Sequence, residues 1–174
     1  GASRTVGERF TTWGVQPLLF ESSATTEDAA LLLADAGEAS VIVGVGPGMG
    51  MSLARRFASE GPVALVVRDA ASGSAYVDEL AAAGHVASAY LADIGDEASL
   101  RAAFGEIRGT LGDPDLVVFN ASVGAAGTPE AVATSDVREA FEVGTLGAVI
   151  SFQEVAPAMR GRGSGTFLVT GSGV

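Results

Sequence analysis

The sequence contains no cysteine and no lysine, and it has a single histidine, His85, and a single asparagine, Asn120. Without cysteine there is no disulfide framework and no thiolate metal site, and one histidine excludes a histidine-rich metal site. Without lysine there is no Schiff-base nucleophile and no phosphate-binding lysine of the P-loop kind. No apolar run approaches the ~20 residues of a membrane span, and no signal-peptide pattern opens the chain. We therefore expect a cytoplasmic protein with no membrane partner.

Positive charge is scarce in this chain. The chain has ten basic residues, all arginines, and 21 acidic ones, which gives a net charge of -11 over 174 residues. Recognition of a phosphate backbone needs clustered Lys and Arg, so we expect no nucleic-acid partner. Apolar residues make up 48% of the chain, which is enough for a full core, and the length suits one compact α/β domain.

Short β-branched runs alternate with longer segments rich in Ala and Leu. The pattern predicts strands over residues 15–20, 40–45, 63–67, 86–91, 116–119 and 166–170, and helices over residues 26–36, 48–60, 73–83, 97–110 and 135–159. From residue 40 onward the strands are apolar throughout, which is typical of a parallel sheet covered on both faces. We therefore predict a doubly wound α/β fold with strand order 3-2-1-4-5.

The first strand of this unit runs into four glycines at alternate positions, Gly44, Gly46, Gly48 and Gly50, at the start of a predicted helix. A pyrophosphate binds backbone N–H groups at such a helix N-terminus, and a Cβ there would collide with it. The segment therefore predicts a dinucleotide-binding loop; the alternative is a tight turn without a ligand. We divide the chain into an N-terminal strand-helix extension, 1–38, and a dinucleotide-binding domain, 39–174. The extension carries no motif and is an added edge strand with a covering helix, a partly ordered arm or a partner-binding segment.

Three polar residues each follow a different predicted strand: Asp93, Asn120 and Ser172. Because ligands of open α/β sheets bind at the carboxyl ends of the strands, we expect these side chains at one rim. Each also has a structural interpretation. Asp93 would hold a local turn or cap the next helix, Asn120 would bridge neighbouring strands, and Ser172 would be a small residue in a glycine-rich turn.

Four elements of the sequence resemble, in order, those of the short-chain dehydrogenase/reductase family. The glycine loop is similar to that family's Thr-Gly-x3-Gly-x-Gly, with Val43 in the place of the threonine. The other three elements are Leu91-Ala92-Asp93-Ile94, Asn120-Ala121-Ser122 and the predicted strand that ends before Ser172. The resemblance covers residues 40–174 and implies a Rossmann-like fold.

The resemblance implies hydride transfer between a nicotinamide and a small-molecule carbonyl or alcohol. We also expect a homo-oligomer, and no metal site. Ser172 would be the catalytic serine that hydrogen-bonds the substrate oxygen. The implied cofactor-binding residues are Gly44, Gly46, Pro47, Gly48, Met49, Gly50, Arg68, Asp93, Ile94, Asn120, Ala121, Ser122 and Thr170.

The residue after the second strand of such a fold contacts the adenosine ribose. Arg68 is the first polar residue after the strand at 63–67, and a guanidinium there would pair with the 2′-phosphate of NADP. We therefore expect NADP rather than NAD. Asp69 is adjacent, and a shift of one residue would place a carboxylate at the ribose, which favours NAD.

Part of the family's catalytic machinery has no match in this sequence. The family uses a tyrosine with a lysine four residues later, and an asparagine in the long helix before the fifth strand. Gly144 stands in the place of that asparagine, and neither Tyr76 nor Tyr90 is followed by a lysine; the tyrosine–lysine pair would lie beyond Val174. Two hypotheses remain: an NADP-dependent oxidoreductase, or a non-catalytic dinucleotide-binding protein that acts as a sensor or partner subunit. A scaffold for a flavin or a nucleotide sugar is a third, supported only by the glycine loop.

Overall fold

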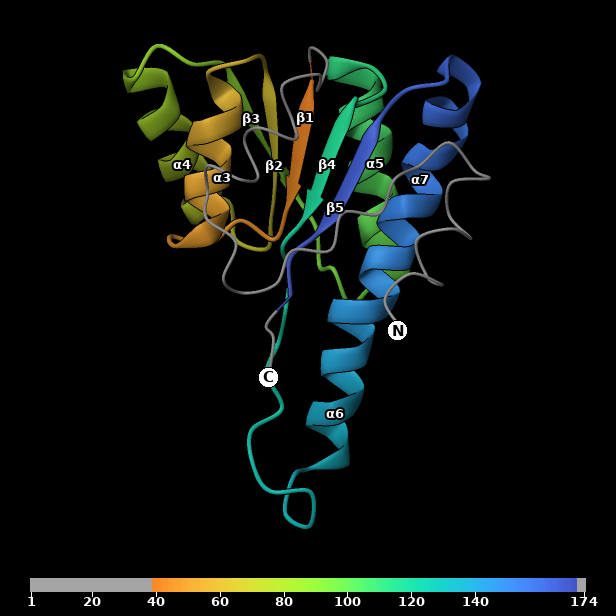
Figure 1. Ribbon diagram of the computed structural model, residues 1–174. Coiled ribbons are helices and arrows are strands. Elements are labelled where there is room, and N and C mark those ends of the chain that lie inside the picture. Colours follow the sequence, from red (N-terminus) through yellow and green to blue (C-terminus); the bar gives the residue numbers. More distant parts are fainter. Residues whose placement is uncertain (1–38, 172–174) are drawn as a thin grey trace, which may run out of the picture.

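The strands of the protein form one parallel sheet (Figure 1) in a computed structural model that describes residues 39–171. The strands are β1 (Ser40–Val43), β2 (Val63–Val67), β3 (Ala87–Leu91), β4 (Leu116–Phe119) and β5 (Thr166–Val169). Their order is β3-β2-β1-β4-β5, which confirms the predicted topology. The predicted elements at 15–20 and 26–36 lie outside the described residues. Within the described part of the chain, no helix is long and apolar enough to cross a membrane.

Helices cover both faces of this sheet. Helices α3 (Met49–Ala58) and α4 (Ala70–Ala82) pack on one face, and α5 (Glu97–Leu111) and α7 (Gly147–Arg162) pack on the other. Side chains of β1 alternate between the faces. Ile42 packs with the core on the α3 and α4 side, and Val41 and Val43 pack with the core on the α5 and α7 side. Strands β1, β2 and β4 are buried along their whole length. Burial on two faces explains why these strands are apolar at every position except Ser40, the buried first residue of β1.

Several element boundaries differ from the predicted ones by one to three residues, and two of these differences have a clear local reason. The first strand ends at Val43 rather than at residue 45, because Gly44 has a φ of +85° and turns the chain out of the sheet. Helix α4 begins at Ala70, three residues before its predicted start. Asp69 is its N-cap, and the carboxylate accepts a hydrogen bond of 2.7 Å from the backbone N–H of Ser72. A cap of this kind satisfies one of the free donors of the first turn.

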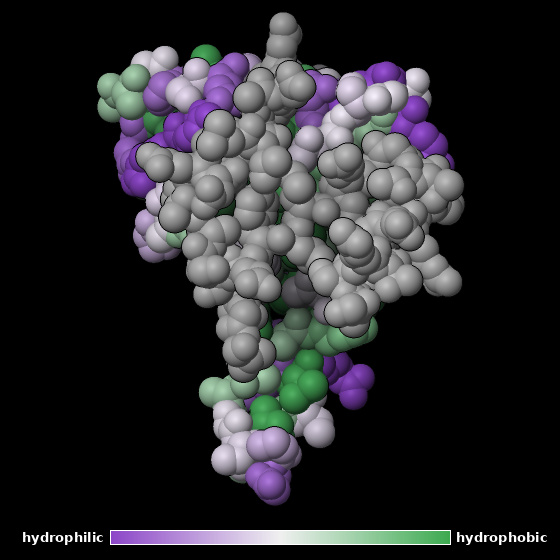
Figure 2. All heavy atoms as spheres, in the orientation of Figure 1, coloured by the Kyte–Doolittle hydropathy of each residue, from purple (hydrophilic) through white to green (hydrophobic). Residues whose placement is uncertain are grey.

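The helix predicted over residues 135–159 consists of three parts. An α-helix, α6 (Thr134–Phe141), passes through a π-helical turn, η2 (Glu142–Leu146), into α7. In the π turn the N–H of Gly147 donates to the carbonyl oxygen of Glu142, five residues earlier. Helix α6 projects beyond the carboxyl ends of the strands (Figure 1) and has no buried residue. This projecting part carries apolar side chains on the face that Figure 2 shows.

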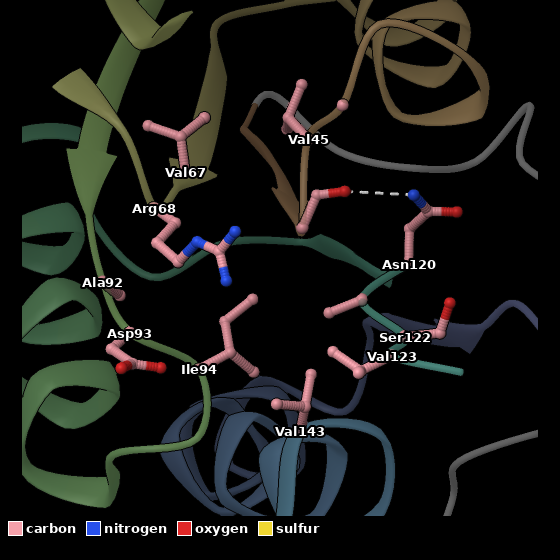
Figure 3. A pocket seen from close by; sticks show the side chains of 13 residues that line it. Val45, Val67, Arg68, Ala92, Asp93, Ile94, Asn120, Ser122, Val123 and Val143 are labelled. Carbon is pink, nitrogen blue, oxygen red and sulfur yellow. Dashed lines mark hydrogen bonds between the residues drawn. The ribbon is translucent and has the colours of Figure 1, made fainter. Parts of the chain in front are cut away.

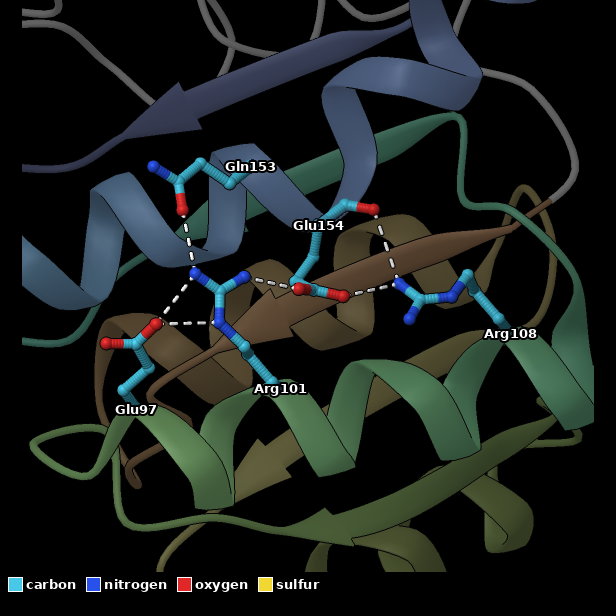
Figure 4. A network of polar contacts seen from close by, with 5 residues as sticks. All are labelled: Glu97, Arg101, Arg108, Gln153 and Glu154. Atoms are coloured by element: carbon cyan, nitrogen blue, oxygen red, sulfur yellow. Dashed lines mark hydrogen bonds and ion pairs between the residues drawn. The ribbon is translucent and has the colours of Figure 1, made fainter.

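A network of charged side chains joins α5 to α7 (Figure 4). Glu154 of α7 forms ion pairs with Arg101 at 2.6 Å and with Arg108 at 2.9 Å. Arg101 also pairs with Glu97 and donates to the side-chain oxygen of Gln153. Burial raises the pKa of the Glu154 carboxyl, but the two guanidinium groups outweigh this effect and hold the pKa below its ordinary value. The network therefore stabilises the contact of the two helices only while Glu154 is ionised.

Candidate functional site

A cavity of about 360 Å³ opens at the carboxyl ends of the first four strands (Figure 3). Most of the lining residues lie at the carboxyl ends of β1, β2, β3 and β4 or in the first few residues after them, and one comes from η2. They are Gly44, Val45, Gly46, Val67, Arg68, Ala92, Asp93, Ile94, Asn120, Ala121, Ser122, Val123 and Val143. Because the strands are parallel, their ends meet at one rim, which is where open α/β sheets bind ligands.

Two glycines of the loop between β1 and α3 are required by the packing of the protein itself. At Gly44, where φ is +85°, an added Cβ would lie 2.6 Å from Cα of Ala121. At Gly50, an added Cβ would lie 2.8 Å from Cα of Val45. No real Cβ approaches backbone atoms this closely, so these two glycines let the loop fold tightly between β4 and α3.

The other two glycines of the loop have no such role within residues 39–171. An added Cβ at Gly46 or Gly48 would meet no described atom within 4 Å, and neither residue has a positive φ. Gly46 lines the cavity, and Gly48 is the N-cap of α3, whose first turn carries no acidic residue. The positive end of α3 is thus left for an anion, and the space that a Cβ would fill suits a phosphate approaching the backbone. The loop therefore fits the pyrophosphate of a dinucleotide.

Asn120 holds the ends of three strands together. Its side-chain Nδ2 donates to the carbonyl oxygen of Gly44 at 3.0 Å, and its Oδ1 accepts from Oγ1 of Thr170 at 2.9 Å. Its backbone N–H donates to the carbonyl oxygen of Val43 at 2.8 Å. Both side-chain polar atoms of Asn120 are therefore used inside the protein. This is the bridging arrangement that the sequence left open as an alternative.

Arg68 and Asp69 are separated by their surroundings. Arg68 lines the cavity, and Figure 3 shows its guanidinium directed into it. Among residues 39–171 Arg68 forms no hydrogen bond or ion pair. Asp69 instead caps α4, and the backbone N–H of Ser72 holds the pKa of its carboxyl below the ordinary value. The free charge beside the cavity at the end of β2 is therefore positive.

Asp93 and Ile94 reach the cavity from the loop after β3. One carboxylate oxygen of Asp93 accepts from the N–H of Gly95 at 3.0 Å, and the backbone N–H of Asp93 donates to Oγ of Ser99 at 3.0 Å. Asp93 thus organises a tight turn ahead of α5, as its structural interpretation anticipated. That turn fixes the place at which Ile94 enters the cavity.

The structure brings part of the predicted site together. Eight predicted residues line the cavity: Gly44, Gly46, Arg68, Asp93, Ile94, Asn120, Ala121 and Ser122. Five others do not line it: Pro47, Gly48, Met49, Gly50 and Thr170. Gly48 and Gly50 build the loop and the start of α3, and Thr170 reaches the site only through Asn120. Ser172 lies outside the described residues.

Sequence reasoning missed five lining residues, all of them small and apolar: Val45, Val67, Ala92, Val123 and Val143. Four are chain neighbours of predicted residues, so widening each motif by one position would have found them. Val143 comes from a helix that is distant in sequence. The sequence indicated Val143 only indirectly. Its neighbour Gly144 stands where the resembling family has a functional asparagine, which suggests that this part of the helix lies near the site.

The sequence of this chain is similar to those of proteins of a known family. A family model described as short chain dehydrogenase matches residues 38–174. The 7α-hydroxysteroid dehydrogenase of Escherichia coli strain K12 is 34% identical over 134 residues, which are 76% of this chain and 52% of that protein. The chain therefore spans about half the length of this relative.

Two solved structures extend the likeness to three dimensions. A 7α-hydroxysteroid dehydrogenase complexed with NADH and 7-oxo glycochenodeoxycholic acid superposes with a TM-score of 0.71 at 32% identity, covering 77% of this chain and 52% of the other. A metagenomic short-chain oxidoreductase in complex with NADP superposes with a TM-score of 0.72 at 26% identity, covering 77% of this chain and 62% of the other. With the family model over residues 38–174, these findings show that the chain belongs to the short-chain dehydrogenase/reductase family.

Proposed function

We propose that the chain is the dinucleotide-binding part of an NADP(H)-dependent oxidoreductase that transfers a hydride between the nicotinamide and a small carbonyl or alcohol. The observation that carries the proposal is Gly46, which lines the cavity although the packing of the described residues does not require glycine there. Space kept open at the positive end of a helix suits a phosphate group. Membership of the family supports the same ligand class.

Each residue has a distinct part in this proposal. The backbone at Gly46 and the start of α3 bind the pyrophosphate, and Asn120 holds the loop in place through Gly44. Arg68 pairs with the 2′-phosphate of the adenosine ribose. By resemblance, Ser172 donates a hydrogen bond to the substrate oxygen. The bound cofactor supplies or accepts the hydride at its nicotinamide ring.

A second candidate function is dinucleotide binding without hydride chemistry, and Gly144 favours it. Glycine has no side chain with which to hold a relay water, and the sequence has no lysine to lower the pKa of a tyrosine. General acid catalysis is typically worth ~10²–10⁴-fold. We therefore expect the 174-residue polypeptide by itself to bind NADPH without appreciable turnover of ketones or aldehydes. Loss of the reduced-nicotinamide absorbance at ordinary enzymatic rates would remove this second candidate.

The cofactor preference is tested through Arg68. We expect titration calorimetry to show tighter binding of NADPH than of NADH, and Arg68→Ala to weaken NADPH by roughly tenfold or more while NADH changes little. Arg55→Ala is the charge-matched control, because Arg55 pairs with Glu79 on the surface of α3 and α4. Equal affinity of the unmodified chain for both cofactors would contradict the assignment.

We also propose that the protein forms a homo-oligomer. Val137, Phe141 and Val149 on the helical segment from α6 into α7 expose 47%, 54% and 47% of their surfaces. Exposed apolar groups of this kind favour association. Light scattering at increasing concentration tests the proposal, and a monomer throughout would contradict it. A cytoplasmic location stays a prediction.

A further inference from the structure

Two glycines interlock the π turn η2 and the start of α7 with the loop after β3. An added Cβ at Gly147 would lie 2.6 Å from Cγ2 of Ile94, so the Ile94 side chain rests directly on Gly147. The second contact runs the other way, from the π turn to the loop. An added Cβ at Gly95 would lie 3.5 Å from Cγ2 of Val143, so the Val143 side chain packs against Gly95. Ile94 and Val143 both line the cavity (Figure 3). The interlock therefore lies directly behind the apolar wall of the site.

The backbone of Gly147 gives no reason for a glycine. Its φ of -56° and ψ of -41° are ordinary helical values that any residue adopts. Glycine inside a helix is about 1 kcal/mol less favourable than alanine. The structure instead shows that there is no room for a larger residue. Gly147 is buried against Ile94 and Phe119, and an added Cβ would lie 3.2 Å from Cζ of Phe119.

The two neighbours of Gly147 differ in how freely they can move. Phe119 is 1% exposed and belongs to the core under α5 and α7. Ile94 is only partly buried, and one side of it faces the cavity. A side chain at position 147 would therefore displace Ile94 rather than Phe119. The open direction for Ile94 is into the cavity.

We propose that Gly147 is a positioning residue for the ligand: by leaving room for Ile94 it sets the width of the apolar part of the cavity and so how tightly a dinucleotide is held. This proposal rests on the proposed function, since it takes the cavity to hold a dinucleotide. The π turn serves the same arrangement, because Val143 within it and Gly147 directly after it both pack against the loop at 93–95.

The test compares Gly147→Ala at the start of α7 with Gly144→Ala, the same change three residues earlier, in η2. An added Cβ at Gly144 meets no described atom within 4 Å, so this variant is the matched control. We expect Gly147→Ala to weaken NADPH binding by roughly tenfold and Gly144→Ala by less than about twofold. Equal affinities of the two variants would overturn the proposal.

A second measurement does not need a ligand. The N–H of Gly95 is held by Asp93 next to the interlock, and its hydrogen exchange reports on the loop. We expect faster exchange at Gly95 in Gly147→Ala and unchanged exchange in Gly144→Ala. If the unmodified chain binds neither NADPH nor NADH, the proposed function fails, and this readout still decides whether Gly147 positions the loop. Unchanged exchange in both variants would overturn the positioning role.

A relief variant covers the case in which Gly147→Ala does not fold. Ile94→Ala removes the methyl group that the new Cβ would strike, so the cost of Gly147→Ala in urea unfolding should shrink in the Ile94→Ala background. The same cost in both backgrounds would show that the substitution acts elsewhere, and the proposal would be wrong.

Discussion

The side-chain amide of Asn120 donates a hydrogen bond of 3.0 Å to the carbonyl oxygen of Gly44, which joins the end of β4 to the first glycine of the loop after β1. The same side chain accepts a hydrogen bond from Thr170 at the end of β5. One residue thus connects three strands at the rim where the cavity opens. The chain's only asparagine therefore holds the glycine loop after β1 in place.

We expect Asn120→Ala to lower the free energy of unfolding by about 1–3 kcal/mol, because it removes both bonds and leaves their partners unsatisfied. NADPH binding should weaken as well, since Gly44 loses its support. Asn120→Asp is the informative comparison, because a carboxylate can still accept from Thr170 but cannot donate to Gly44. Urea unfolding at neutral pH should find Asn120→Asp destabilised too. Native stability in Asn120→Asp would show that the bond to Gly44 contributes nothing.

A buried hydroxyl in α7 gives a prediction of the opposite sign. Ser151 is fully buried, and its Oγ has no hydrogen-bond partner among the described residues. An unsatisfied buried polar group costs about 1–3 kcal/mol, so Ser151→Ala should raise the free energy of unfolding by roughly 1 kcal/mol. Ser99→Ala is the control, because Oγ of Ser99 accepts from the N–H of Asp93 and its loss should destabilise. A destabilised Ser151→Ala would mean that the hydroxyl has a partner after all.

The ion pairs of Glu154 make part of the stability dependent on pH. Because the two arginines hold the pKa of Glu154 below its ordinary value, the pairs stabilise the fold at pH above ~4.3, and this contribution is lost as the pH falls through the folded pKa. Glu154→Gln should therefore lower the free energy of unfolding by roughly 1–2 kcal/mol at pH ~7 and by much less at pH ~3.

Glu79→Gln serves as the comparison for Glu154→Gln. Glu79 pairs with Arg55 on the surface, where both side chains are about half exposed, and such pairs contribute little. Urea unfolding of both variants at the two pH values separates a general charge effect from the α5–α7 network. Parallel pH profiles for the two variants would argue against a special role for Glu154.

The sequence was most informative where one physical requirement explains why a residue type occurs at a position. Alternating glycines between an apolar strand and a helix predicted the loop, and wholly apolar strands predicted the parallel order of the sheet. Arg68 and Asp69 could not be separated by composition, because the distinction depends on Asp69 capping α4. The π turn has no recognised residue pattern, so neither the break in the helix at Glu142 nor the position of Val143 in the cavity could be predicted.

The central claim is that the space at Gly46 exists for a dinucleotide, and one comparison tests it most directly. Titration calorimetry of NADPH is carried out on the unmodified chain and on Gly46→Ala, with urea unfolding of both and of Gly44→Ala. Gly44→Ala should lose stability, because its Cβ would lie 2.6 Å from Cα of Ala121 at a φ of +85°. Gly46→Ala should keep the stability of the unmodified chain and lose NADPH affinity by roughly tenfold or more. An unmodified chain that does not bind NADPH, or a Gly46→Ala variant that binds it equally well, would contradict the account.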